Sequence, residues 1–183
     1  TASLTNCTIS GNTATSGGGG INSYTANTTL TNCTISGNQT NGDGGGIVLN
    51  FGSLSLTNLT VSGNTANSGG GIYHTANGVL TVGNTIVSAN TATTSPDIVG
   101  TIDTDNGYNL FGAALSGTTS GTGDVFSDAP LLTALGNYGG PTETHALLKD
   151  SPALNNGDWN LAVGIAGLTL QTDQRGIDPR HVA

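Results

Sequence analysis

The side chains with the clearest chemical potential are acids near the middle of the chain. Asp103 and Asp105 are separated by one residue and followed by Asn106 and Gly107, the spacing with which calcium-binding loops begin. Asp97 precedes this loop and could add a further oxygen. The bidentate glutamate that completes an EF-hand loop is missing, so we expect a solvated acidic turn and no cofactor. Calcium, with Asp97, Asp103 and Asp105 as candidate ligands, is the alternative.

The sequence offers little of what polysaccharide-cleaving enzymes need. Glycoside hydrolysis uses two carboxylates on either side of a groove, and lyase chemistry uses a base. Residues 1–92 contain a single acid, Asp43, a single histidine, His74, and no lysine or arginine. The later acids are scattered along the chain. We therefore predict a protein that is not an enzyme, with a carbohydrate-binding or carbohydrate-cleaving, pectate-lyase-like function as the alternative.

The charge balance narrows the choice of partners. Eleven acids stand against three lysines and arginines, which gives a formal net charge of −8. A nucleic-acid partner requires a basic surface, so nucleic acid is not expected. No stretch approaches the roughly 20 apolar residues that cross a bilayer, so membrane insertion within this chain is not expected either.

A nine-residue motif repeats through the first half of the chain. It reads LTNCTISGN from Leu4 and again from Leu30, LTNLTVSGN from Leu56 and VGNTIVSAN from Val82, at a constant step of 26 residues. Apolar and polar residues alternate within it, which predicts short strands with one inward face. One unit cannot form a core, whereas stacked units cover one another. A leucine-rich repeat needs denser leucines, and a propeller blade needs about 40 residues or more.

Stacking in register predicts columns of like residues. We expect three short strands in each coil, with about 4.8 Å between coils and right-handed winding. Two apolar columns and one polar column at a bend then follow, formed by Leu4, Leu30, Leu56 and Val82, by Ile9, Ile35, Val61 and Val87, and by Asn6, Asn32, Asn58 and Asn84. Stacked asparagines can hydrogen-bond along their column. The fold class predicted is all-β, a right-handed single-stranded parallel β-helix, or solenoid, with 26-residue coils and an irregular C-terminal cap.

The two cysteines, Cys7 and Cys33, lie one repeat apart. They therefore share a column, and both should point inward because Cys7 has the same parity as Ile9. Leu59 takes the position in the next repeat, which favours two stacked free thiols that act as small apolar residues. A disulfide is the alternative, because the coil spacing falls within its Cα range, although parallel Cβ vectors would strain it.

The order of motifs in the last part of the chain resembles the choice-of-anchor Q domain of bacterial surface proteins. The matching blocks begin at Asn84 (NTIV), Gly107 (GYNL), Asn137 (NYGGPTETHAL), Ser151 (SPAL) and Thr172 (TDQRG). The upstream GGGI and SGNTA units are similar to repeats of polymorphic outer-membrane proteins. The resemblance implies a secreted bacterial protein that is held at the cell surface.

We interpret residues 1–92 as about 3.5 coils and residues 93–183 as the last coil or coils and a capping region continuous with the helix. An open solenoid end exposes apolar columns and unpaired backbone groups, so terminal units are atypical. Five leucines could cover the last coil, namely Leu131, Leu132, Leu135, Leu147 and Leu148. In the cap we expect structural roles for His145 and for an ion pair between Asp173 and Arg175.

These features together predict an extracellular structural or adhesive surface scaffold. The first residues fall within a coil, so either further coils precede them or a second copy stacks there head to tail and builds a filament or sheath. The expected partners are therefore another copy of the chain, other components of the cell surface, or glycans.

Overall fold

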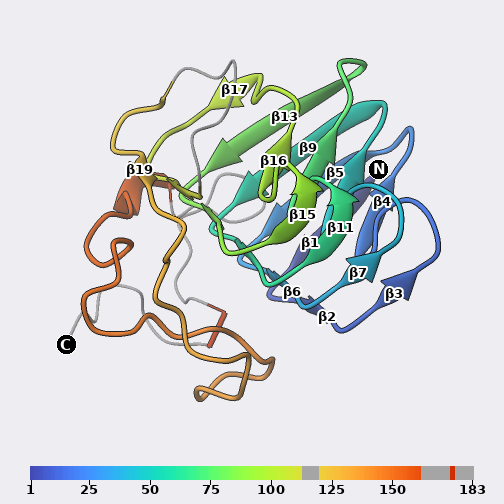
Figure 1. Cartoon of the computed structure of the whole chain (residues 1–183). Coiled ribbons are helices and arrows are strands. Elements are labelled where there is room, and N and C mark those ends of the chain that lie inside the picture. The colour runs from blue at the N-terminus through green and yellow to red at the C-terminus, as the bar shows by residue number, and fades with distance from the viewer. Residues whose placement is uncertain (113–119, 162–173, 176–183) are drawn as a thin grey trace.

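The repeated units stack as successive coils of a parallel β-helix (Figure 1). The structure is a computed structural model that describes residues 1–112, 120–161 and 174–175. Its strands form four parallel sheets, which we call sheets A to D. Every pairing between named strands joins one coil to the next, at 26-residue steps through most of sheets A and B. A single short 3-10 helix, η1 (Trp159–Leu161), occurs in the described residues.

Sheets A and B are the two longest. Sheet A contains β1 (Ala2–Thr5), β5 (Asn27–Thr31), β9 (Gly52–Thr57), β13 (Gly78–Gly83) and β17 (Thr104–Asp105). Sheet B contains β2 (Thr8–Ser10), β6 (Thr34–Ser36), β10 (Thr60–Ser62), β14 (Ile86–Val87), β18 (Leu110–Phe111) and β19 (Val125–Phe126). Parallel pairing therefore continues past residue 92, as far as Phe126.

Sheets C and D complete each coil. Sheet C contains β3 (Thr13–Ala14), β7 (Gln39–Thr40), β11 (Thr65–Ser68) and β15 (Thr91–Thr94), and sheet D contains β4 (Ile21–Ser23), β8 (Ile47–Leu49), β12 (Ile72–His74) and β16 (Ile98–Val99). Isoleucines head the sheet D strands in one column. That column shortens its step to 25 residues between Ile47 and Ile72. The residue is lost before the glycine triplet, because Thr65 pairs with Gln39 at a 26-residue step whereas Ser68 already pairs with Asp43 at a 25-residue step.

The core is made of inward columns in which each side chain lies on its counterpart in the next coil. Leu4, Leu30, Leu56 and Val82 pair in register in sheet A, and Ile9, Ile35, Val61 and Val87 pair in register in sheet B, where Phe111 and Phe126 continue the column. The residues of the middle coils are completely buried, because a coil lies on both sides of them. Burial of these apolar side chains, at about 25 cal/mol per Å², is the main stabilising contribution.

The corners explain why each coil has four strands, and the expectation of three was wrong. Asn6, Asn32, Asn58 and Asn84 turn the chain from sheet A to sheet B with φ between 54° and 58°. A second left-handed corner, at Gly11, Gly37 and Gly63, separates sheet B from sheet C. Asparagine and glycine adopt this backbone region at the lowest cost. Ala89 takes the same corner in the fourth coil, at φ 59°.

The glycine triplets form the corner between sheets C and D, where the backbones of successive coils approach most closely. A Cβ on Gly45 would lie 2.4 Å from the carbonyl oxygen of Gly70, and a Cβ on Gly70 would lie 2.5 Å from that of Pro96. No side chain fits at such a distance, so the triplet is required by packing between coils.

Residues 127–161 lie beside the solenoid, along sheet B. Ser88 Oγ donates to the carbonyl oxygen of Ser127 in the fourth coil, Ser36 bonds to His145 in the second, and Thr8 Oγ1 donates to the carbonyl oxygen of Glu143 in the first. Residues 127–143 thus run along the outer face of sheet B toward β2 (Figure 1), and the chain then returns to the fourth coil, where Asp158 N donates to Asn84 Oδ1. We call residues 127–161 the strap.

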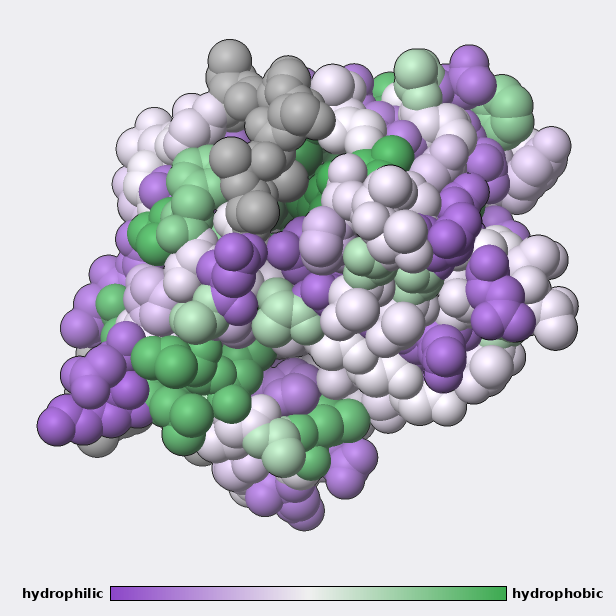
Figure 2. All heavy atoms as spheres, in the orientation of Figure 1, coloured by the Kyte–Doolittle hydropathy of each residue, from purple (hydrophilic) through white to green (hydrophobic). Residues whose placement is uncertain are grey.

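Three of the five leucines that were expected to cover the last coil, Leu131, Leu147 and Leu148, lie in the strap and are 38–43% exposed. Figure 2 shows apolar surface gathered at the lower left and the bottom, over the strap, while the surface of the coils is mostly neutral or hydrophilic. Among the described residues, no helix has both the length and the apolar character needed to cross a membrane.

Candidate functional site

A buried asparagine ladder runs through the corner between sheets B and C. Asn12, Asn38 and Asn64 each use both the backbone N and Nδ2 to donate to the Oδ1 of the asparagine in the next coil, at 2.9–3.1 Å. Asn38 and Asn64 are completely buried. The Nδ2 of each also donates to a carbonyl oxygen of the coil before, that of Ile9 or Ile35, at 2.9–3.0 Å. This ladder was missed by sequence reasoning, which selected the neighbouring asparagine column.

The ladder ends on a carboxylate. Asn90 donates from its backbone N and its Nδ2 to Oδ1 of Asp97, at 3.1 and 2.9 Å. Burial raises the pKa of Asp97, the two bonds from Asn90 act in the opposite direction, and the charge of Asp128 raises the pKa further. Gly112 makes room for this carboxylate, since a Cβ on Gly112 would lie 1.7 Å from Asp97 Oδ2. Asp97 therefore terminates the ladder as its last acceptor.

The selected column, Asn6 to Asn84, forms a second ladder with other geometry. Asn32 Nδ2 donates to Asn6 Oδ1, and Asn84 Nδ2 donates to Asn58 Oδ1. Asn6 is exposed, whereas Asn32 is 6% exposed. The column therefore forms a partly covered edge of the solenoid, and its left-handed backbone places the amides along the corner.

Asp103 and Asp105, the other two candidate calcium ligands, have different neighbours from Asp97. Asp103 Oδ2 accepts a hydrogen bond of 2.7 Å from Leu80 N and lies 3.8 Å from His74 Nε2. Asp105 accepts from Gly107 N and from Asn109 Nδ2, both at 2.8 Å. The structure therefore gives each of these acids its own set of hydrogen-bond donors.

Asp105 is paired with a second acid, Asp124, that the sequence did not single out. Both carboxylates accept from Gly121 N and from Asn109 Nδ2. Burial raises the pKa of Asp105, and its hydrogen bond with Asp124 raises it further. In the parts of the chain that the structure describes, no three histidine, cysteine, aspartate or glutamate side chains gather to hold a metal ion. Calcium binding at this loop stays a prediction.

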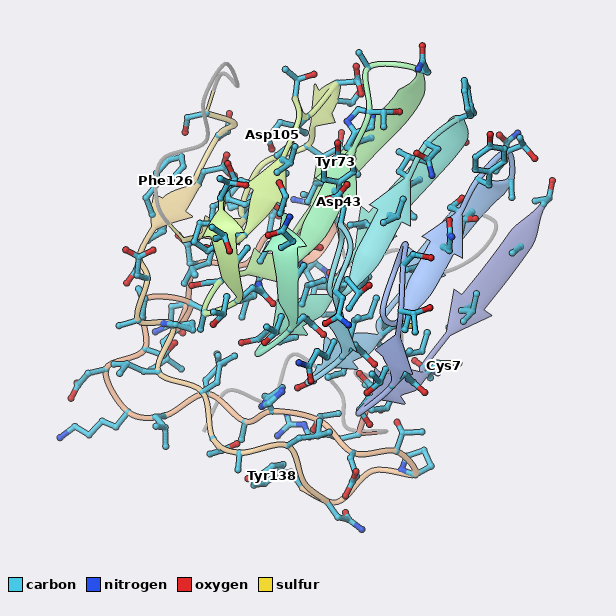
Figure 3. All side chains as sticks on the ribbon, turned by 45° about the vertical axis from the view of Figure 1, so that its right-hand side comes forward. Cys7, Asp43, Tyr73, Asp105, Phe126 and Tyr138 are labelled. Atoms are coloured by element: carbon cyan, nitrogen blue, oxygen red, sulfur yellow. The ribbon has the colours of Figure 1, made fainter. Side chains whose placement is uncertain are left out.

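Cys7 and Cys33 stack as neighbouring free thiols near the first coil. Each Sγ donates to a carbonyl oxygen two residues before it, Thr5 or Thr31, at 3.2 Å. Cys33 Sγ also accepts from the backbone N of Cys7 at 3.4 Å. Burial raises the pKa of Cys33, so its thiol form is favoured. Figure 3 places Cys7 at one end of the stack, far from Asp105 and Phe126.

The strap is held by His145 and by a glutamine that sequence reasoning missed. His145 has both ring nitrogens bonded, Nδ1 to the carbonyl oxygen of Thr133 at 2.7 Å and Nε2 to Ser36 Oγ at 2.8 Å. Gln174 accepts from Thr34 Oγ1 at 2.9 Å, and its Nε2 donates to Thr8 Oγ1 at 2.9 Å and to the carbonyl oxygen of Cys7 at 3.2 Å. Asp173, the expected partner of Arg175, lies outside the described residues.

A groove of about 280 Å³ separates part of the strap from sheet B. Its floor includes Thr60, Ile86 and Leu110, and Tyr108 and Leu147 also line it. In sheet B, one outward position is occupied by threonine in the first three coils, including Thr60. Ile86 occupies it in the fourth coil and Leu110 in the fifth. The groove therefore combines apolar surface with hydroxyl and amide groups.

Two features define the class of protein. Its parallel coils stack in register, and ladders of asparagine side chains join successive coils by hydrogen bonds at the corners. These are the features of a parallel β-solenoid. The family model described as right handed beta helix region matches residues 1–118, so the chain belongs to this family, and the winding is right-handed. Comparison with curated proteins and with solved structures gave no match.

Proposed function

We propose that the chain is a rod-shaped module of an extracellular surface scaffold with a structural or adhesive role. The observation that carries this proposal is the buried ladder through Asn38 and Asn64. Each amide is bonded to the coil after it and to the coil before it. Bending or unwinding the stack would break several buried hydrogen bonds at once, each costly to leave unmade. A solenoid joined in this way is suited to hold other parts of a protein at a fixed distance.

The outward positions support the same role. In sheet A, the column formed by Ser3, Thr29, Ser55 and Thr81 alternates with the inward leucines and valine and faces away from the core. Hydroxyl groups of this kind hydrate well without adding charge, and only 8% of all residues are charged. Such a surface suits a protein that projects into the medium from a bacterial cell.

Surface exposure can be tested with an antibody raised against residues 1–112. Intact cells of the source organism should be labelled, and brief treatment of the cells with a protease should remove the label. A cytosolic protein serves as the control for cell integrity. Labelling that requires permeabilised cells would contradict the proposal.

The partner proposed for the first coil is another coil of the same kind. Strands β1, β2, β3 and β4 each pair on one side only, which leaves backbone groups available for parallel pairing. Preceding residues of a longer protein or a second copy of the chain could supply that coil. Concentration-dependent growth in light scattering, with filaments in electron micrographs, is expected for the second copy. A monomer at all concentrations would remove self-assembly from the proposal while leaving the scaffold role untouched.

The groove under the strap favours glycan binding as a second candidate function. Its apolar floor and the tyrosine suit the apolar face of a sugar ring, and Thr60 and Asn156 offer hydrogen bonds. Ile86→Thr restores the hydroxyl of the preceding coils and should weaken binding of neutral glycans on an array. Val79→Thr, at an exposed position of sheet A, is the matched control. Equal glycan binding by both variants would exclude the groove.

A further inference from the structure

Successive coils are joined at the corner between sheets B and C by the same three hydrogen bonds. Between the second and third coils, Asn38 donates from its backbone N and its Nδ2 to Asn64 Oδ1, each at 3.0 Å. Asn64 Nδ2 donates back to the carbonyl oxygen of Ile35 at 3.0 Å. The junctions before and after this one repeat all three bonds. The ladder therefore has a direction, because each coil donates twice to the asparagine Oδ1 of the coil after it.

The first coil carries the unfilled end of this ladder. Asn12 donates twice to Asn38, but its own Oδ1 accepts no hydrogen bond from the described residues. The Nδ2 groups of Asn38 and Asn64 also donate to a carbonyl oxygen of the coil before, a bond that Asn12 does not make within the described part of the chain. Asn12 is exposed. A coil stacked on this face must therefore offer two N–H donors and one carbonyl oxygen.

The far end of the ladder has no donor to offer. Asn90 already uses its backbone N and its Nδ2 to donate to Asp97 Oδ1, at 3.1 and 2.9 Å. An ionised carboxylate only accepts hydrogen bonds. Stacking the far end of one chain on the first coil of another would therefore leave Asn12 Oδ1 without the donors that every other junction supplies.

The two ends of the solenoid also differ at the corner between sheets A and B and in shape. Asparagine occupies this corner in the first four coils, whereas Tyr108 occupies it in the next, with φ 57°. The Oδ1 of Asn84, the last asparagine of that column, already accepts from Asp158 N of the strap at 3.0 Å. Among the described residues, sheets C and D end at β15 and β16, while sheets A and B continue to β17 and β19. The first coil thus presents four strands of one coil, whereas the far end presents strands of different coils.

We propose that the face of the first coil is a docking surface for one further coil that carries asparagine at the ladder position, and that the far end of the same chain does not fit it. The docking rests on the proposed function, in which the first coil pairs with another coil, and does not depend on where the protein is located. The incoming asparagine donates from its backbone N and its Nδ2 to Asn12 Oδ1. The carbonyl oxygen three residues before it accepts from Asn12 Nδ2, as Ile9 accepts from Asn38.

Hydrogen bonds select the partner of this face, because its strands contain no charged side chain. The sequences of β1, β2, β3 and β4 are ASLT, TIS, TA and INS. An incoming coil with aspartate at the ladder position would bring a second acceptor against Asn12 Oδ1. Two acceptors that face each other in a junction closed to water cost free energy. The face therefore distinguishes asparagine from aspartate at a single position of its partner.

One added coil tests the docking in the full chain. A copy of residues 27–52 placed directly before Thr1 continues the 26-residue step and sets its copy of Asn38 next to Asn12. Asn38→Asp in the added copy replaces the Nδ2 donor with an acceptor. Gln39→Glu in the added copy is the matched control, because it makes the same change of charge one residue away, at an exposed position.

Hydrogen exchange at two amides of the first coil reports whether the added coil docks. Thr34 N and Gln39 N each donate to a carbonyl oxygen of the coil before, at 2.9 and 2.8 Å. Thr8 and Thr13 are their counterparts in the first coil, so their amides should gain such acceptors from the added coil. Their protection should rise about tenfold or more over that in the unextended chain.

The variants decide what the face recognises. The rise in protection at Thr8 and Thr13 should persist with Gln39→Glu in the added copy and disappear with Asn38→Asp. The amides of β10 should exchange equally in all extended proteins, which shows that the rest of the solenoid is folded. No rise with the unaltered added coil would overturn the docking. An equal rise with Asn38→Asp would overturn the role of the ladder asparagine.

The unextended chain tests the second half of the proposal. Its far end lacks the donors that the first coil needs, so sedimentation velocity should show no head-to-tail assembly as the concentration is raised. Filaments that lengthen with concentration would overturn the exclusion of the far end. Labelling of intact cells decides the surface role separately, since the docking of a coil on purified protein is measured without reference to the cell.

Discussion

Asn38 donates twice to a single atom of Asn64, since its backbone N and its Nδ2 both lie 3.0 Å from Asn64 Oδ1. Asn64 repeats the arrangement toward Asn90, at 3.0 and 2.9 Å. The amide thus serves the backbone of its own corner and the stacking of the coils at once. Because the two residues are completely buried, water cannot replace these bonds.

Removal of the Asn64 amide should destabilise the solenoid strongly. Asn64→Ala deprives Asn38 of its acceptor and leaves Ile35 O and Asn90 Oδ1 without a donor from this side chain. We expect a loss of about 3–5 kcal/mol in the free energy of unfolding, measured by urea denaturation followed by circular dichroism. Asn12→Ala, at the exposed end of the same ladder, should lose less than about 1 kcal/mol. Similar losses in both variants would contradict the role of burial.

The repeat made the register of the solenoid predictable, but it did not predict the number of corners in each coil. A 26-residue step places Leu30 on Leu56 and Ile35 on Val61, whatever lies between them. The motif contains two asparagines per unit, and the sequence alone does not tell which one belongs to the completely buried ladder. The choice depends on the left-handed backbone at Gly37, which turns the following Asn38 inward.

The strap was beyond sequence reasoning for a different reason. No period relates Ser127 to Ser88 or His145 to Ser36, and their contacts span 39 and 109 residues. Leu147 and Leu148 were expected to cover the end of the solenoid, because the apolar columns of the last coil would otherwise be exposed to water. The outer face of sheet B, where the strap lies, offered no apolar signal in the first three coils, since its outward residues are threonine and serine.

Two glycine substitutions should differ in cost. Gly45→Ala would place a Cβ 2.4 Å from the carbonyl oxygen of Gly70 and 2.7 Å from Thr65 N, so the coils must separate. Gly37→Ala meets nothing closer than 4.0 Å and has only the cost of its left-handed backbone, at φ 64°. We expect Gly37→Ala to lose about 1–2 kcal/mol of stability and Gly45→Ala to lose more. The melting temperatures of the two variants test this order. A lower melting temperature for Gly37→Ala than for Gly45→Ala would show that the close approach of the coils at Gly45 does not limit stability.

Gln174 should control attachment of the strap to the first two coils. It is 7% exposed and joins Thr8 and Thr34 to the strap through Thr142. Gln174→Ala should make residues 127–161 cleave severalfold faster in limited proteolysis, with loss of about 1–2 kcal/mol of local stability. Gln39→Ala, at an exposed position of sheet C, is the control and should leave the cleavage rate unchanged. Unchanged cleavage in Gln174→Ala would show that other contacts hold the strap.

The two thiols should react in sequence. Cys7 is partly exposed, while Cys33 is buried and burial raises its pKa, which lowers the fraction of reactive thiolate. Iodoacetamide at neutral pH should therefore modify Cys7 first in the native protein, and Cys33 should react fully only in denaturant. Mass spectrometry of chymotryptic fragments, in which cleavage after Tyr24 separates the two cysteines, gives the order. Equal native rates at both sites would mean that the first coil opens readily.

The carboxylate at the end of the asparagine ladder should make the protein more stable in mild acid. Burial raises the pKa of Asp97 in the folded state, so ionisation costs more there than in the unfolded chain. The contribution is complete below the pKa of an unfolded aspartate, about 4, and is lost as the pH rises through the folded-state pKa. The melting temperature should therefore decrease as the pH is raised from 4 toward 7.

Asp97→Asn isolates this contribution. The amide keeps an Oδ1 acceptor for Asn90 and removes the buried charge beside Asp128. We expect the variant to be about 1 kcal/mol more stable than the wild-type protein at pH 7 and to show a shallower dependence of melting temperature on pH. Asp150→Asn, at an exposed turn, should retain the wild-type pH dependence. An Asp97→Asn variant that melts lower at pH 7 would mean that the ladder needs the charge, because ionised Asp97 would then be the better acceptor for Asn90.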